Sequence, residues 1–175
     1  MDTMTALLER RSCRSYKPDL VPDAVLEEIL KAGTYAPTAM GRQSPIILCV
    51  TNKELRDRLS RINASFTPNP GGDPFYGAPT VLVVLASKDV APHVYDGSLV
   101  MGNLMNAAWD KGVNSCWIHR ARETFESEEG KAILKELGIE GDYEGIGNCI
   151  LGYATGPEAF RSPAPRKDNY IYYVK

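Results

Sequence analysis

The chain lacks the short motifs that mark the common nucleotide, nucleophile and metal sites. No GxGxxG follows a strand-like run, and GxxxxGK[ST], GxSxG and HExxH are all missing from its 175 residues. A Rossmann dinucleotide site, a P-loop, a hydrolase nucleophile and a zinc-protease site are therefore not indicated. If the protein is an enzyme, we expect a bound cofactor to carry the chemistry.

Cysteine is scarce, and its spacing excludes a redox or metal motif. The four cysteines form no CxxC pair, and three of them lie in the apolar runs IILCV, NSCWI and GNCIL. A reduced cysteine in such a run behaves as a small core residue, which predicts a reducing compartment. No run approaches the roughly 20 apolar residues of a membrane span, and the N-terminus has no signal-like apolar stretch. We therefore expect a cytoplasmic protein with no membrane partner.

Neither sign of charge is in large excess. The chain has 20 Lys and Arg against 22 Asp and Glu, a net charge of −2, which argues against a general nucleic-acid-binding surface. Its length suits one domain with a full core, and no repeat or linker divides it, so residues 1–175 are predicted to form a single domain. Basic residues nevertheless gather in two places, near opposite ends of the chain.

The pattern of apolar residues predicts helices that alternate with buried strands. Helices are expected over 3–10, over 22–33, from Asn52 through Ile62, over 97–111, and from Ser127 to a stop at Gly138. Strands are expected over 46–51, 80–86, 114–119 and 145–154. This order leaves α+β and α/β open and predicts one central mixed sheet flanked by helices.

Three further segments suit ligands or partners. Residues 67–79 are rich in Pro, Gly and Asn, which predicts a mobile surface loop and a candidate lid over a site. The helix over 97–111 is apolar nearly all the way round, so it should be buried by the core or by a partner chain. The C-terminus ends in an aromatic run over 170–174, which suits docking on another subunit.

The first basic cluster is Arg10, Arg11, Ser12 and Arg14. Guanidinium groups bind phosphate in a planar, bidentate way, so the cluster is a candidate anion receptor. The alternative is a solvated helix end, where cations are favourable in any case. The second cluster, Arg166-Lys167, stands between prolines and the aromatic run, and it is either an exposed tail charge or a stiffened pair that faces a fixed anion.

Two other segments carry candidate binding residues. The loop over 36–43 is made of small residues that let a planar group approach the backbone, with Gln43 as donor and acceptor, although an ordinary connection is the simpler interpretation. His119 ends a buried strand, a common place for a ligand. It is either an acid–base group or simply a polar strand end.

In this order, four segments resemble the flavin-dependent nitroreductase family, and the resemblance covers nearly the whole chain. Arg10 to Tyr16 is similar to the family's RRSxRxF/Y start, and Ala36 to Gln43 is similar to its APSxxNxQPW loop. Residues 103–118 resemble its NLxLAAxxLGLGSCWI segment, and Gly152-Tyr153 followed by Pro165-Arg166-Lys167 resembles its GYP…PRK ending. Each motif is weak alone, but four in the family's order are fairly specific.

The resemblance implies an α+β fold and an intertwined homodimer with FMN at the subunit interfaces. It implies that Arg10, Ser12, Arg166 and Lys167 bind the FMN phosphate, with Arg11 beside them, and that Arg14 lies near the N1/O2 edge of the flavin. It implies backbone contacts from Ile118 and His119 near flavin N5. Pro37, Thr38, Ala39 and Met40 would reach the flavin from the partner subunit, with Gln43 nearby. The C-terminal tail, from about residue 157 to 175, would extend onto the partner.

The implied activity is an FMN-dependent NAD(P)H oxidoreductase that passes hydride by a ping-pong route to a small-molecule acceptor such as a nitroaromatic or a quinone. The alternatives are a related flavin reaction, such as reductive dehalogenation, or a flavin-binding sensor without turnover. Gly41 departs from the family pattern, where Asn is frequent, and so does the His119-Arg120 pair. Arg120 could add an anion-binding group for the substrate or for a nicotinamide phosphate. NADH and NADPH remain equally open as the reductant.

Overall fold

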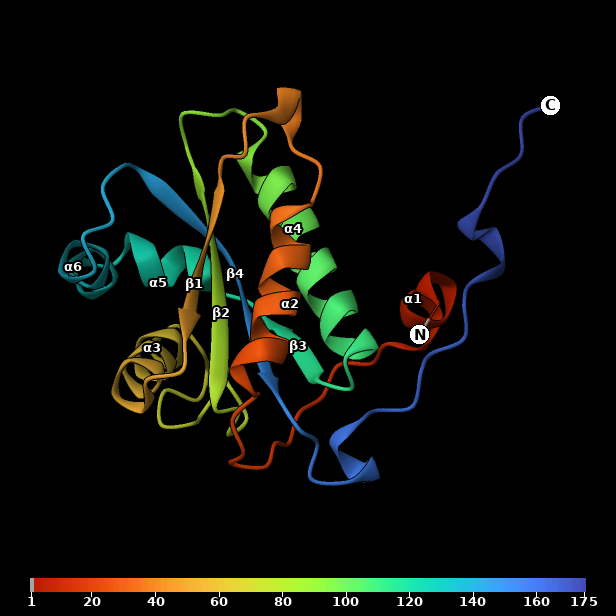
Figure 1. Cartoon of the computed structure of the whole chain (residues 1–175), viewed down its shortest axis with the longest axis horizontal. Coiled ribbons are helices and arrows are strands. Elements are labelled where there is room, and N and C mark those ends of the chain that lie inside the picture. The colour runs from red at the N-terminus through yellow and green to blue at the C-terminus, as the bar shows by residue number, and fades with distance from the viewer. Residues whose placement is uncertain (1) are drawn as a thin grey trace.

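A four-stranded sheet forms the centre of the computed structural model, which describes residues 2–175 (Figure 1). The strands are β1 (Pro45–Val50), β2 (Thr80–Ser87), β3 (Asn114–Ile118) and β4 (Tyr143–Gly152), in the spatial order β1-β2-β4-β3. Every neighbouring pair of strands is antiparallel. The predicted mixed sheet is therefore wrong, because apolar runs reveal burial but not the direction in which strands pair.

Strand β2 divides the core into two halves. Its alternate side chains face opposite sides of the sheet, as the strand period requires. Val81, Val83 and Leu85 enter one apolar cluster, while Leu82 and Val84 enter the other. All five are completely buried. The expected run over 80–86 was therefore a central strand covered on both faces.

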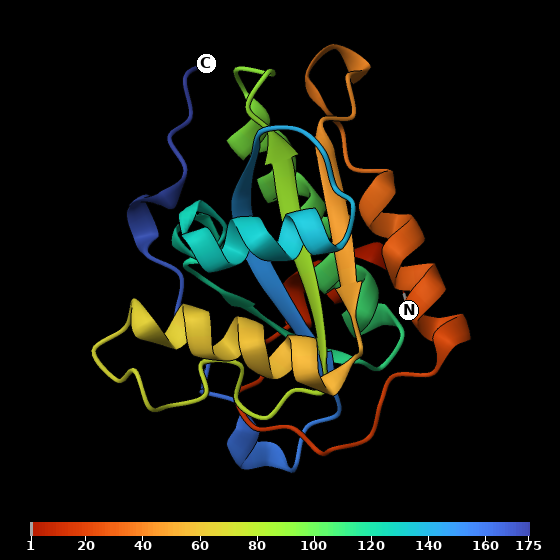
Figure 2. The ribbon, with the colours of Figure 1, turned by 90° about the vertical axis from the view of Figure 1, so that its left-hand side faces the viewer.

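Helices cover both faces of the sheet (Figures 1 and 2). On one face lie α2 (Asp23–Thr34) and α4 (His93–Asp110), and on the other α3 (Lys53–Ser65), α5 (Ala121–Glu126) and α6 (Glu128–Glu136). The short α1 (Thr3–Glu9) packs outside α4. Asn52 and Ser127 cap α3 and α6 as the sequence indicates, since each side chain accepts a hydrogen bond from the first helical turn.

Two helices differ most from the sequence prediction. Helix α4 begins at His93, four residues before the expected start at 97, because the chain turns into it directly after Pro92. Helix α5 was not predicted, since six residues with a single short apolar patch give no readable period. It packs closely on β4, where Gly145 leaves no room for a side chain beside the carbonyl of Ala121.

The two ends of the chain meet beside β3. Isolated bridges pair Ser12 with Ser115 in parallel, Cys13 with Phe160 and Tyr16 with Ala154. Beyond Phe160 the tail leaves the body of the molecule, and residues 161–175 are all exposed. It contains the 3-10 turn η3 (Asp168–Tyr170) and runs along the outside past α1 in Figure 1. Within residues 2–175, no helix is both long and apolar enough to cross a membrane.

Candidate functional site

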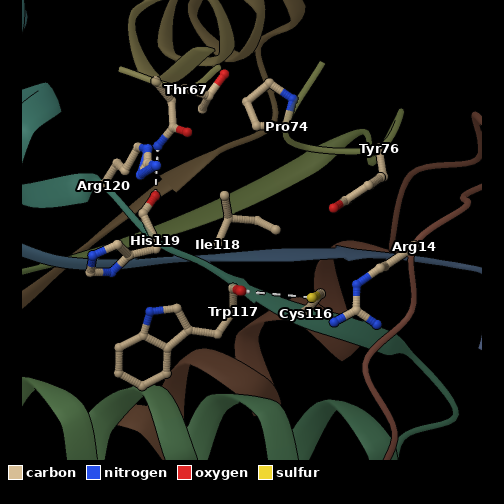
Figure 3. Close-up of a pocket in the computed structure, with 10 residues that line it drawn as sticks. Arg14, Thr67, Pro74, Tyr76, Cys116, Trp117, Ile118, His119 and Arg120 are labelled. Carbon is tan, nitrogen blue, oxygen red and sulfur yellow. Dashed lines mark hydrogen bonds between the residues drawn. The ribbon is translucent and has the colours of Figure 1, made fainter. Parts of the chain in front are cut away.

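A cavity of about 240 Å³ lies at the end of β3, between the sheet and α3 (Figure 3). Its lining comes from four separate segments: the chain after α1, helix α3, the loop after α3, and β3 with the turn that follows it. The lining residues are Arg14, Asn63, Thr67, Pro74, Tyr76, Cys116, Trp117, Ile118, His119 and Arg120. Two arginines and no carboxylate line this cavity, so it favours an electron-rich or anionic ligand.

The turn after β3 is held by two buried asparagines. Asn63 Nδ2 donates a hydrogen bond of 2.8 Å to the carbonyl of His119, and Asn148 Nδ2 donates one of 3.4 Å to that of Ile118. Both asparagines are almost fully buried. These hydrogen bonds fix the backbone of Ile118 and His119 from two sides without a ligand. The family resemblance implies flavin contacts from this same backbone.

Arg14 reaches the cavity from the segment that pairs with β3. Its backbone N–H donates a 2.9 Å hydrogen bond to the carbonyl of Ala159, and its neighbour Cys13 donates to the carbonyl of Ser115. The guanidinium points inward, toward the β3 side of the cavity (Figure 3). Among residues 2–175 no carboxylate forms an ion pair with Arg14, so its charge is available to a ligand.

The loop over 67–79 forms a wall of this cavity through Thr67, Pro74 and Tyr76. Its anchor is Asp73, which accepts 2.6 Å hydrogen bonds from Arg56 and from Ser60 on α3. The same carboxylate accepts from the backbone N–H groups of Phe75 and Gly77, and Phe75 is fully buried. The loop therefore borders the cavity, and its second half is tied to α3. Its role as a lid stays a prediction.

The carboxylate of Asp73 is held in its charged form. Partial burial alone would raise its pKa, but the hydrogen bonds from Arg56 and Ser60 and the Arg56 charge outweigh burial and lower the pKa below its ordinary value. Arg56 is itself buried and also donates to the carbonyl of Ala78. The loop anchor is therefore a charged network that remains intact at neutral pH.

Arg10 and Arg11 have different contacts. Arg11 Nη1 donates 2.9 Å hydrogen bonds to the carbonyls of Leu8 and Arg10, which closes the end of α1. Arg10 Nη1 is buried without a hydrogen-bond partner among the described residues, and it lies near Cys149. Burial raises the pKa of that thiol to about 12, so Cys149 stays neutral and offers Arg10 no charge. A buried guanidinium nitrogen without a partner makes Arg10 a candidate anion-binding residue.

The loop over 36–43 is anchored but points away from the β3 cavity. Buried Asp96 on α4 accepts from the Ala39 N–H at 3.0 Å, and the Gln43 N–H donates to Thr38 Oγ1 at 3.1 Å. Met40, at the tip, is 86% exposed. Figures 1 and 2 both show this orange turn at the top of the molecule, whereas the red segment after α1 lies in the lower half.

The predicted site residues thus fall into four places. Arg10, Arg11 and Ser12 lie between α1 and the bridge of Ser12 with Ser115 on β3. Arg14, Ile118 and His119 line the β3 cavity. Thr38 and Gln43 border a separate, largely apolar cavity of about 420 Å³ between α2 and β1, on the same loop as Pro37, Ala39 and Met40. Arg166 and Lys167 are exposed on the tail, where Lys167 lies over the Tyr170 ring at 5.5 Å. A single chain brings together Arg14, Ile118 and His119 in one cavity and holds Ser12 beside the same strand.

Strained backbone conformations occur in the loop over 36–43 and at the β3 cavity. The non-glycine residues with positive φ in the described chain are Met40, Gln43, Tyr76 and Arg120. The first two lie in the loop over 36–43, and the other two line the β3 cavity. Such conformations cost on the order of 1–3 kcal/mol each and concentrate at functional sites. Sequence analysis did not find Tyr76, Asn63 or Asp73, because their roles depend on contacts with distant segments that no local motif reveals.

Comparison with known proteins identifies the family and the fold. The nitroreductase family profile matches residues 7–153, so the chain belongs to the nitroreductase family. In a nitroreductase crystal structure from Bacteroides fragilis with bound FMN, the fold is shared over 100% of both chains, with a TM-score of 0.90 and 25% identity.

Two archaeal relatives carry the provisional name NADH dehydrogenase/NAD(P)H nitroreductase. The one from Archaeoglobus fulgidus is 27% identical over 165 residues, which cover 91% of this chain and 89% of the relative. The one from Methanothermobacter thermautotrophicus is 26% identical over 121 residues, which cover 67% of this chain and only 60% of the relative.

Proposed function

We propose that this protein is an FMN-dependent NAD(P)H oxidoreductase that reduces nitroaromatics, quinones or similar small acceptors by a ping-pong route. The observation that carries the proposal is the cavity at the end of β3, where Arg14 faces a fixed backbone turn without a carboxylate to neutralise it. Membership of the family, the FMN in the B. fragilis structure and the names of the archaeal relatives support the choice of cofactor and reductant.

The residues present fit FMN. A phosphate needs two or more charge-assisted partners, and Arg10 has a buried nitrogen with no partner among the described residues. The ring system needs an uncharged wall and a cation at one edge, and the cavity supplies Ile118, Pro74 and Arg14. No carboxylate lines the cavity to repel an electron-rich ring.

Each part of the chain then has a defined task. Arg10 and Ser12, with Arg166 and Lys167, would hold the phosphate, and Arg14 would favour negative charge on the ring. The turn at Ile118 and His119, fixed by Asn63 and Asn148, would orient the ring. Pro74 and Tyr76, carried by the anchored loop, would exclude water from one side of the cavity. When bound, FMN supplies the acceptance of hydride from the nicotinamide and its delivery to the acceptor.

The overall reaction balances without a catalytic side chain. NAD(P)H, a proton and a quinone give NAD(P)⁺ and the hydroquinone; a nitro group takes the same two electrons with two protons and gives a nitroso group and water. The protein contributes binding, orientation and electrostatics, which suffice when a cofactor carries the chemistry.

A homodimer is part of the proposal. The loop over 36–43 projects Met40 into solvent, and the tail exposes Tyr172 and Tyr173, while Tyr95 and Leu99 leave an apolar stretch of α4 uncovered. An uncovered apolar stretch on a helix suits an interface. We propose that a second copy covers them, and that Pro37, Thr38, Ala39 and Met40 complete the partner's site together with Gln43.

The decisive test is spectroscopic and kinetic. Purified protein should be yellow, should release about one FMN per chain on denaturation, and should oxidise NADH or NADPH faster when a quinone or nitroaromatic is added. A yellow protein that no acceptor re-oxidises would favour the sensor alternative. A colourless protein that takes up no added FMN would refute the proposal.

A further inference from the structure

Arg120 lines the β3 cavity in a conformation that an arginine rarely adopts. Its φ is 71°, in the left-handed region, where a glycine or asparagine is the ordinary choice. The carbonyl of Arg120 accepts hydrogen bonds from Thr124 N–H at 3.0 Å and Thr124 Oγ1 at 2.8 Å, which locks the turn. The fold therefore keeps a charged side chain where the backbone alone would prefer a smaller one.

The Arg120 side chain has no partner within residues 2–175. Its Nε is buried without a hydrogen bond, and no carboxylate pairs with its guanidinium, including Glu123 one turn along α5. Neighbouring Arg122, by contrast, pairs with Glu126 at 2.9 Å and lies outside the cavity. Folding does not explain why an arginine is kept at a position where it is strained, half-buried and unpaired. These features suit a role in ligand binding.

Together with Arg14, Arg120 gives the cavity two cations on different walls. The two side chains come from opposite sides of the drawn residues in Figure 3, with Ile118 between them. One guanidinium suffices for the electron-rich edge of a ring, as proposed above for Arg14. The second is then available to a separate anionic group that lies in the same cavity.

We propose that Arg120 binds an anionic substituent, a carboxylate or a group of like charge, on the oxidising substrate, so that the enzyme prefers acidic aromatic acceptors. This inference rests on the proposed function, because it assigns the acceptor class of that same site. Arg120 directly follows His119 at the proposed reacting turn. The 2′-phosphate of NADPH lies at the far end of a dinucleotide from its reacting ring, so a residue beside the ring serves the acceptor instead.

The first test uses the full-length, FMN-loaded protein with benzoate and benzamide, which match in shape and differ in charge. Titration followed by calorimetry should show benzoate binding about tenfold more tightly, the contribution expected of one charge-assisted contact at a half-buried site. Arg120→Asn should abolish the preference and leave benzamide unchanged. Arg122→Asn, the matched control, should keep it.

Stability gives a second readout. Because Asn and Gly tolerate positive φ, Arg120→Asn and Arg120→Gly should unfold at the same or a higher temperature than the parent chain. Loss of the benzoate preference in such variants is therefore loss of a contact and not of the fold. An unchanged preference in both variants would overturn the assignment of Arg120.

Steady-state kinetics distinguish a role of Arg120 in binding the acceptor from a role in binding the nicotinamide. With 4-nitrobenzoate and 4-nitrobenzamide as acceptors, Arg120→Asn should lower the ratio of their kcat/KM values about tenfold and leave the NADPH-to-NADH ratio unchanged. A fall in the NADPH-to-NADH ratio alone would assign Arg120 to the reductant and overturn the proposal. A colourless chain that still binds benzoate through Arg120 would refute the flavin function and support the anion site.

Discussion

The two basic clusters of this chain differ in how the fold uses them. The segment from Arg10 to Arg14 pairs with β3 and with the Ala159–Phe160 stretch, and it places a guanidinium in a cavity. Arg166 and Lys167 lie on a tail whose residues from 161 to 175 are all exposed. The first cluster is preorganised by the core, whereas the second gains a fixed position only through a ligand or a second copy of the chain.

This contrast indicates which parts of the site one chain can build. A preorganised group loses little conformational entropy when it binds. A free tail loses conformational entropy worth on the order of 1–2 kcal/mol for each residue that becomes ordered. In the proposed dimer, the tail recovers that cost through contacts with the second copy of the chain. Its exposed aromatic residues are suited to make them.

Removal of the tail should have the largest effect. A chain that ends after Pro165 loses both cations and the aromatic run, so we expect FMN affinity to fall by at least about 100-fold, the value of two charge-assisted contacts, and the dimer to dissociate. Sedimentation and FMN release measure both. The double variant Arg166→Gln/Lys167→Gln, with its aromatic residues intact, should lose FMN and keep the dimer. An intact yellow dimer after truncation would disprove the role of the tail.

Arg14→Ala and Arg10→Ala should each weaken FMN retention by roughly 10- to 100-fold, because each removes a charge-assisted contact of about 1.5–3 kcal/mol. Equilibrium dialysis against FMN measures the change. Neither guanidinium pairs with a carboxylate within residues 2–175, so the fold itself should persist. Retention equal to that of the parent chain in both variants would move the site elsewhere.

Asp73→Asn tests the anchored wall of the cavity. It removes the charge that Arg56 and Ser60 bind, so we expect the free energy of unfolding to fall by about 1–2 kcal/mol, a range discounted for the partial exposure of Asp73. Urea unfolding measures the loss. FMN release should also become faster, since Tyr76 and Pro74 lose their support. Equal stability of variant and parent would show that the loop is not held by this network.

The same network predicts a pH dependence. The pKa of Asp73 is lower in the folded chain than in the unfolded chain, so its contribution is complete above the unfolded value near 4 and is lost as pH falls through the folded value. Below about pH 4, the difference in unfolding free energy between the parent chain and Asp73→Asn should therefore shrink. A difference that stays constant down to acid pH would contradict the proposed cause.

Arg11→Gln should have the smallest effect. The Arg11 guanidinium is already engaged with the carbonyls of Leu8 and Arg10 at the end of α1, so we expect FMN affinity to change by less than about threefold and stability by about 0.5 kcal/mol. The comparison with Arg10→Gln separates a capping cation from a binding one. A loss as large as that of Arg10→Gln would place Arg11 in the phosphate site.

Sequence analysis could predict most of the elements but not how they join. The helix starts at Asn52 and Ser127 and the apolar run of β2 depend on local chemistry, so the sequence could predict them. The antiparallel direction of the sheet depends on pairing between distant segments, and the prediction of a mixed sheet failed.

The candidate site shows the same division. Arg14, Ile118 and His119 were found through family-like motifs, and the structure brings them to one cavity. The anchor at Asp73 and the support from Asn63 could not be found, because their partners lie 13 to 56 residues away. The roles of the loop over 36–43 and of the tail remain predictions, since both are assigned to the proposed dimer.

The most direct test is sedimentation equilibrium of the purified protein, recorded in the flavin absorption band. We predict a yellow species with the mass of two chains that carries about one FMN per chain and loses it after truncation at Pro165. A single chain that binds FMN fully, with or without its tail, would contradict the claim that the preorganised half of the site needs the exposed half to be completed.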